Sequence, residues 1–225
     1  GIDVSDWPKE AQRSDAWGDA AGDNKLEFRS PEGRAVVLKL KTAPDVANGI
    51  LDQYELGPYN LIITGEPSRW RGEFMAFFDS GIVQTVTTMA PCSVLVARNS
   101  LDRKGFFICT DGSARSMQAV RRAAVLADVV GEPITLFSVA DSEAGKPAAE
   151  EAVANARALL KAMKITVADT RAAVGNPAEE IVERGSLYKV IVVTDEGRSR
   201  LQRLIRGSTA TEVVRKARTS VLDVR

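Results

Sequence analysis

Two polar stretches, each following an apolar run, carry the residue types that recognise phosphate and sugar groups. One is Asp111-Gly112-Ser113, and the other extends from Thr194 to Thr209, where nine residues lie between Gly197 and Gly207. Glycines let main-chain amides approach phosphate closely, and hydroxyl groups donate hydrogen bonds to its oxygens. A helix N-terminus behind such a loop favours an anion, and an aspartate accepts from a ribose hydroxyl or an adenine amine. These residue types together predict nucleotide recognition.

Each stretch also has a purely structural explanation. Asp111-Gly112-Ser113 can be a turn with a helix cap, and Gly207-Ser208 can be a bend at a helix boundary. Three arginines of the second stretch recur every third residue, namely Arg200, Arg203 and Arg206. On a helix they would share one side, which can be a solvated face or can contact phosphate or an acidic partner. The second stretch also contains the acidic pair Asp195 and Glu196. Together with Asp111 this pair could hold Mg²⁺ in a carboxylate hydrolase, although the pattern is unspecific.

Composition excludes several classes of protein. The chain has 225 residues, 30 Lys and Arg, 30 Asp and Glu, no His and two Cys. Without histidine there is no Ser-His-Asp or Cys-His nucleophile and no His-ligated zinc. The zero net charge argues against a nucleic-acid partner, and no apolar run approaches the ~18 residues that span a membrane. The two cysteines make no disulfide framework, so we expect a cytoplasmic protein. The sequence offers no dedicated catalytic constellation, and we do not expect an enzyme.

Apolar runs and helical patterns alternate from about residue 105 to the end of the sequence. The pattern predicts βαβαβαβαβ, an α/β domain with a Rossmann-like parallel sheet and helices on both faces. The third predicted strand covers 165–174, and Asn176 and Pro177 predict the start of the next helix. Ligands of such sheets bind outside the carboxyl ends of the strands, where the strand order reverses. This is where Asp111-Gly112-Ser113 and the stretch after Thr194 are expected.

The first half repeats the closing part of this pattern at an offset of roughly 128 residues. Tyr59–Thr64 matches Tyr188–Val193, and Ala90–Arg98 matches Ala217–Arg225. Residues 35–40 are predicted as a strand that mirrors the one ending at Val174. At this offset the first copy lacks its opening strand. We therefore expect two domains, a partial and degenerate one over residues 1–101 and a complete one over 102–225.

The residues in this order resemble a tandem universal stress protein, with the universal stress protein or adenine nucleotide alpha hydrolase-like fold. In that family the first strand ends in Asp, often followed by Gly-Ser, as in Asp111-Gly112-Ser113. Its phosphate loop reads Gly, two residues, Gly, nine residues, Gly, Ser or Thr, and here Thr194 replaces the first Gly. The family's second strand meets the adenine edge at the position of Val139. The resemblance therefore implies a nucleotide site formed by Asp111, Gly112, Ser113, Val139, Thr194, Gly197, Arg198, Gly207, Ser208 and Thr209.

The resemblance implies a regulatory stress-response protein that binds ATP or another adenine nucleotide in its second domain, with Mg²⁺ as a further candidate. In the family, domains associate through the final strand of the sheet. The segments Cys92–Arg98 and Ser220–Arg225 are therefore expected to pair within the chain, where Asp223 could block the pairing or meet Arg98 or Arg225. A homodimer is also possible on this pattern. The alternative function is a pairing or regulatory module that acts through protein–protein contacts and binds no nucleotide.

Overall fold

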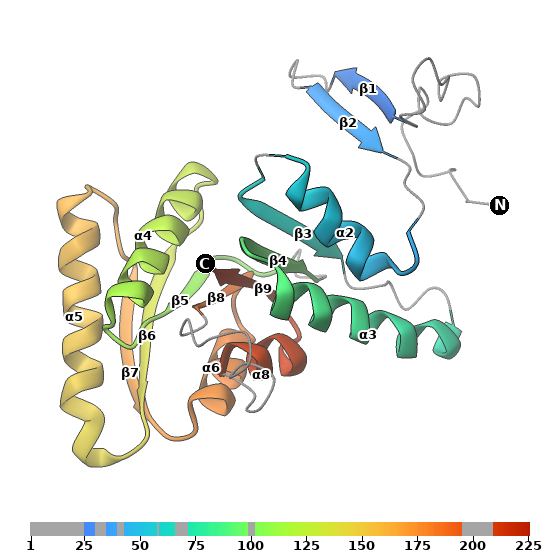
Figure 1. The fold of residues 1–225 in the computed structure, drawn as a ribbon. Coiled ribbons are helices and arrows are strands. Elements are labelled where there is room, and N and C mark those ends of the chain that lie inside the picture. The colour runs from blue at the N-terminus through green and yellow to red at the C-terminus, as the bar shows by residue number, and fades with distance from the viewer. Residues whose placement is uncertain are drawn as a thin grey trace. The chain divides into compact units, whose positions relative to one another are not determined.

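The computed structural model describes residues 25–29, 35–39, 43–57, 59–65, 72–98, 102–194 and 209–225 (Figure 1). The chain divides into two compact units, residues 1–49 and 50–225. Helix α2 (Val46–Glu55) crosses this division. Asp45 caps the helix, because its carboxylate Oδ1 accepts a hydrogen bond from the Asn48 N–H at 2.9 Å.

The first unit contains an antiparallel hairpin of β1 (Lys25–Arg29) and β2 (Ala35–Lys39). The strand predicted at residues 35–40 is present, but its interpretation as a mirror of the strand ending at Val174 is wrong. It belongs to a separate two-stranded sheet. A partner five residues upstream can be reached with little loss of loop entropy, so local pairing is favoured. The alternation of polar and apolar residues in β1 is the signal that could have identified this partner.

The second unit is built on a seven-stranded sheet of order β3-β4-β9-β8-β5-β6-β7. Neighbouring strands are parallel, except for the antiparallel pair β4–β9. Within the predicted βαβαβαβαβ region the strand order reverses at β5, which has β6 on one side and β8 on the other. The strands are β3 (Leu61–Gly65), β4 (Ser93–Ala97), β5 (Phe106–Cys109), β6 (Ile134–Ala140), β7 (Asp169–Val174), β8 (Val190–Thr194) and β9 (Ser220–Val224).

Helices cover both faces of this sheet, as predicted for the α/β class (Figure 1). Helices α4 (Ala114–Val129) and α5 (Lys146–Ala162) pack on one face, over a core that includes Ile108, Leu136 and Val192. Helices α6 (Pro177–Gly185) and α8 (Thr209–Lys216) lie on the other face, which α3 (Gly72–Met89) also joins. Successive strand residues alternate between the two faces, so Phe107 and Ile191 serve the second core.

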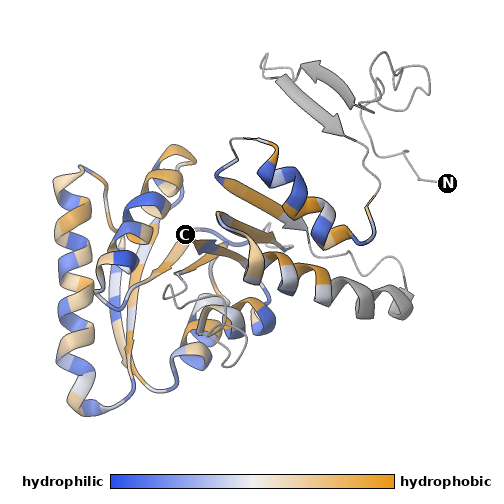
Figure 2. Ribbon diagram, in the orientation of Figure 1, coloured by the Kyte–Doolittle hydropathy of each residue, from blue (hydrophilic) through white to orange (hydrophobic). Residues whose placement is uncertain are grey.

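Hydropathy follows this layering, with apolar strands inside and polar residues on the outer sides of the helices (Figure 2). The strand β9 is buried along its whole length. Among the described residues, no helix is both long and apolar enough to cross a membrane.

The predicted helix boundaries are met where capping residues are present. Asn176 caps α6, since its side chain accepts hydrogen bonds from the N–H groups of Ala178 and Glu179. The third predicted strand is too long at its start, because β7 begins only at Asp169. Lys164, at a φ of 61°, closes α5, and the Ile165 N–H donates to the Leu160 carbonyl at 2.9 Å. Residues before β7 therefore complete the helix C-cap.

The antiparallel strands β4 and β9 are each followed by an arginine, and each arginine bonds to the other strand. Leu95 lies opposite Leu222 at the centre of the pair. The main-chain N–H of Arg98 donates to Ser220 Oγ at 3.0 Å, and that of Arg225 donates to Ser93 Oγ at 3.1 Å. Each guanidinium also reaches the end of the helix that precedes the other strand.

The helix carbonyls that these guanidinium groups reach occupy matching positions. Arg98 donates to the Val214 carbonyl of α8 at 2.7 Å, and Arg225 donates to the Thr87 carbonyl of α3. A cation at a helix C-terminus is favoured by the helix dipole. Arg225 also pairs with Asp223 at 3.3 Å, and both side chains are almost fully buried, at 6% and 2% exposed.

At the amino end of the sheet, Glu132 ties three elements together. Its carboxylate accepts from Lys189 Nζ at 2.6 Å and from the Gly105 N–H at 2.7 Å. The hydrogen bond from Lys189 is the largest of the effects that lower the pKa of Glu132. The end of α4 is thereby joined to the starts of β5 and β8.

Candidate functional site

The chain after β5 forms a tight, hydrogen-bonded turn into α4. The Ser113 N–H donates to Asp111 Oδ1 at 2.9 Å, and Ser113 Oγ accepts from the Ser116 N–H at 3.2 Å as the N-cap of α4. Gly112 has a φ of 80°, which favours glycine, and an added Cβ would lie 3.1 Å from the Cβ of Ala152 in α5. The structural reading of this stretch as a turn with a cap is therefore correct, and a ligand would meet a preformed loop.

The environment of Asp111 keeps its carboxylate charged. Desolvation by burial is the largest effect and raises its pKa, but hydrogen bonds from Ser116 and Ser113 together lower the pKa below its usual value. Only one carboxylate oxygen is needed for the bond to the Ser113 amide. An exposed anionic acceptor therefore stands at the carboxyl end of β5, suited to a hydroxyl or amine donor.

Two residues that the sequence did not single out support this turn. Thr110 Oγ1 lies 2.9 Å from Ser116 Oγ and accepts from the Gly112 N–H at 3.1 Å. Ser116 is buried at 1% exposure. The spacing of three residues between Ser113 and Ser116 is the signal that could have identified the pair, because it joins the N-cap to the first helical turn.

Val139 offers main-chain groups to the space above Asp111. The ladder between β5 and β6 ends where Cys109 lies opposite Phe137, while β6 continues to Ala140. The Thr110 N–H donates to the Phe137 carbonyl at 2.9 Å, so Phe137 directs its polar groups toward β5. Alternate residues of a strand direct them to the same side, hence Val139 also points its N–H and C=O past the end of β5. A flat base with donor and acceptor edges can bind there.

Thr194 ends β8 without disturbing the strand. It lies opposite Val224 of β9, and its Oγ1 donates to the Val224 carbonyl at 2.9 Å. Among the described non-glycine residues only Lys164 has a positive φ, so Thr194 adopts a backbone conformation open to any residue. The Thr in place of the family's Gly is thus compatible with the strand.

The strand ends bring part of the predicted site to one edge of the sheet. Asp111, Val139 and Thr194 follow or end the parallel strands β5, β6 and β8, whose carboxyl ends share that edge. Helix α8 leads back to the start of β9, so its first residue, Thr209, also faces this edge. The remaining predicted residues, Gly197, Arg198, Gly207 and Ser208, lie outside the described residues.

Neither cysteine has the surroundings of a reactive thiolate. Cys109 and Cys92 are free and buried, and desolvation raises the pKa of both thiols. Each therefore behaves as a small buried hydrophobic residue. In the described part of the chain no group of three or more metal-ligating side chains could hold a metal ion. The acidic pair that the sequence associates with Mg²⁺, at positions 195 and 196, lies outside that part.

Comparisons with known proteins give the following similarities. The model of the universal stress protein family matches residues 104–225. The comparison with curated proteins found no match. A solved universal stress protein in complex with cAMP is 26% identical over 55% of this chain and 97% of that chain, with a TM-score of 0.49.

Two longer structures match more of the chain. A universal stress protein from Archaeoglobus fulgidus is 17% identical, with a TM-score of 0.59, over 80% of this chain and 64% of that chain. A putative universal stress protein from Pseudomonas aeruginosa is 15% identical, with a TM-score of 0.63, over 81% of this chain and 69% of that chain. These likenesses concern the fold, and they extend over a larger share of the chain than residues 104–225.

Proposed function

Because the chain belongs to the universal stress protein family, we propose that it is a regulatory stress-response protein whose residues 102–225 bind ATP or a related adenine nucleotide. The observation that carries the proposal is the pairing of two polar features at one sheet edge. The Asp111 carboxylate stands at the end of β5, and the main-chain groups of Val139 point past that same end.

The nucleotide would lie across the carboxyl ends of three strands. Val139 on β6 meets the adenine edge, and Asp111 after β5 accepts from the ribose or from the adenine amine. The phosphates then point toward the end of β8, where Gly197, Arg198, Gly207, Ser208 and Thr209 form the proposed phosphate loop. Mg²⁺ would accompany the triphosphate and offset the acidic residues of that loop.

The role proposed for the site is binding and not bond making. The preformed turn at Asp111 uses its neighbouring hydroxyl groups for internal hydrogen bonds, which suits a fixed recognition surface. We also propose a cytoplasmic location, on the composition of the chain.

A thermal shift measurement with matched variants tests nucleotide binding. A ligand that binds only the folded state at about 100 times its Kd stabilises that state by ~2.7 kcal/mol, which raises Tm by several degrees for a chain of this size. Millimolar Mg-ATP should produce this shift, and Asp111→Asn should reduce it while keeping an acceptor for the Ser113 amide. Asp128→Asn, at the far end of α4, is the control and should respond like the parent protein. Equal shifts for the two variants, or no shift for the parent, would contradict the proposal.

We further propose that residues 1–101 hold a partial second copy, which pairs with the copy at 102–225 through the final strands. The supporting observation is the reciprocity of the β4–β9 junction. One constant shift in residue number relates Ser93 to Ser220 and Arg98 to Arg225. The same shift relates Leu95 to Leu222, which face each other at the centre of the pair.

The reciprocal bonds obey that shift as well, because Arg98 reaches Ser220 while Arg225 reaches Ser93. Such a pattern is what a local two-fold axis through the Leu95–Leu222 pair produces. The final strands are then satisfied within one chain, as edge strands must be. A homodimer would need another surface. Light scattering should give the mass of one chain, and a stable dimer held through β9 would contradict this proposal.

A further inference from the structure

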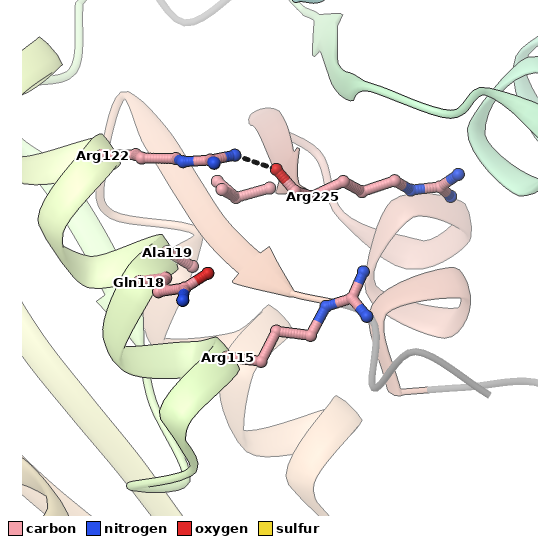
Figure 3. Close-up of a pocket in the computed structure, with 6 residues that line it drawn as sticks. Arg115, Gln118, Ala119, Arg122 and Arg225 are labelled. Carbon is pink, nitrogen blue, oxygen red and sulfur yellow. Dashed lines mark hydrogen bonds between the residues drawn. The ribbon is translucent and has the colours of Figure 1, made fainter.

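A pocket of roughly 300 Å³ lies between α4 and the end of β9 (Figure 3). Its lining residues are Arg115, Gln118, Ala119, Arg122, Val224 and Arg225. The four helix residues are spaced three, four and seven apart, so they form one face of α4. Ala119 and Val224, both buried, provide an apolar floor beneath the polar groups.

The side chains that line this pocket are basic and neutral. Three of the six described lining residues are arginines, and none has an acidic side chain. The guanidinium of Arg225 is directed away from the pocket, to the Asp223 carboxylate and to the carbonyls of Thr87 and Ala90. Two guanidinium groups, those of Arg115 and Arg122, therefore remain for a ligand.

These two arginines differ in how they are held. Arg122 donates to the main-chain oxygen of Arg225, which fixes its guanidinium at one wall of the pocket (Figure 3). Arg115 is exposed, and within the described part of the chain its guanidinium makes no hydrogen bond or ion pair. Because Arg carries five N–H donors, both retain donors for an oxyanion. A fixed guanidinium and a free one on the same helix face can both donate to one phosphate group when Arg115 turns toward Arg122.

The position of the pocket indicates which oxyanion it takes. Val139, Asp111 and Thr194 mark the ends of β6, β5 and β8, in that order along the edge, and β9 is next. A nucleotide placed with its base at β6 therefore directs its phosphates toward β9, where the pocket begins. The pocket volume is at the small end of the range for ligand pockets, which suits a phosphate group and not a whole nucleotide.

We propose that Arg115 and Arg122, with Gln118, form a phosphate-binding subsite between α4 and the end of β9. The identification of the ligand as a phosphate group rests on the proposed nucleotide site. The existence of the pocket does not depend on that proposal. The phosphate can belong to the adenine nucleotide bound at the same edge or to a separate phosphorylated molecule. Both sources present the same tetrahedral oxyanion to the two guanidinium groups.

Calorimetric titration of the full chain with three probes tests this subsite. The probes are ATP, pyrophosphate and adenosine, and the variant is Arg115→Gln. Loss of a charge-assisted hydrogen bond pair should weaken phosphate binding by roughly tenfold to a hundredfold. Arg121→Gln is the matched control, because Arg121 carries the same charge on the same helix and does not line the pocket. Its affinities should equal those of the parent.

The pattern of affinities separates the two sources and the two proposals. Weakening of ATP, with adenosine unchanged, assigns the subsite to the phosphates of the nucleotide. Weakening of pyrophosphate alone assigns it to a separate phosphorylated molecule, and this holds even if ATP does not bind and the proposed nucleotide site fails. If Arg115→Gln weakens no phosphate probe more than Arg121→Gln does, or if the parent binds neither ATP nor pyrophosphate, the subsite is refuted. If ATP binds the parent, and Arg115→Gln weakens neither ATP nor pyrophosphate, the nucleotide site stays intact and the subsite alone is overturned.

Discussion

Replacing Arg225 by methionine should strongly destabilise the second unit. The substitution keeps most of the apolar stem but removes a guanidinium that pairs with Asp223 at 3.3 Å, where the two side chains are 6% and 2% exposed. It also removes the donor to the carbonyls of Thr87 and Ala90. Breaking a buried ion pair by removing one partner costs about 3–5 kcal/mol, because the other charge is left in a poorly solvated place. We expect a loss in that range.

A double substitution separates the ion pair from the packing. Asp223→Val with Arg225→Met replaces both charges by apolar groups, so no buried charge is stranded. The double variant should therefore be more stable than Arg225→Met alone, with a coupling energy of about 2 kcal/mol or more.

Urea unfolding followed by circular dichroism supplies the free energies. Arg225→Met, Asp223→Val and the double variant should differ from the parent in the midpoint of unfolding and not in the slope, because the surface exposed on unfolding is unchanged. A cost below about 1 kcal/mol for Arg225→Met, the value typical of exposed pairs, would show that this ion pair does not contribute as a buried pair. So would double-variant energies that simply add.

Three further predictions concern other parts of the second unit. Gly112→Ala should lower the free energy of unfolding by about 1–3 kcal/mol in urea titrations, since φ is 80° and the new Cβ meets α5. The pKa of Glu132 is lowered chiefly by its hydrogen bond with Lys189, so the stability it contributes is present above its unfolded pKa of about 4.3 and is lost as pH falls through the folded value. The free energy of unfolding, measured from pH 7 down to about 3, should thus fall less steeply for Glu132→Gln than for the parent. Parallel curves for the two proteins would count against a stabilising role of the Glu132–Lys189 pair. Cys92 and Cys109 should resist a thiol reagent in the folded protein and react once urea unfolds it, because burial raises both thiol pKa values; rapid labelling without urea would show that the burial is wrong.

Local signals in the sequence predicted much of the second unit. Asn176 before Pro177 identified a helix start, since the side-chain cap and the fixed φ of proline act within a few residues. The alternation of strand and helix patterns identified the α/β class, because each pattern is also a local signal in the sequence. The start of β7 was misplaced because the apolar Ile165 completes the C-cap of α5 and does not enter the strand.

Long-range contacts were beyond such signals. The strand β2 pairs with β1, the strand that it can reach through a short loop. The sequence pattern alone permits more than one pairing partner for β2. The burial of Asp223 with Arg225, and the turn of the Arg225 guanidinium toward α3, depend on elements far apart in the chain. In the candidate site, residue type and family resemblance both indicated Asp111, and the resemblance alone indicated Val139. The free main-chain groups of Val139 follow only from how far β6 extends beyond the end of β5.

Backbone NMR titration with Mg-ATP is the decisive test of the nucleotide site, because it reports which residues contact the nucleotide. We expect saturable amide shifts at Asp111, Gly112, Ser113, Val139 and Thr194, at the carboxyl edge of the sheet. Gly105 and Lys189, at the amino edge, should stay unchanged. Shifts centred on the amino edge, or none at millimolar nucleotide, would contradict an adenine nucleotide site in residues 102–225.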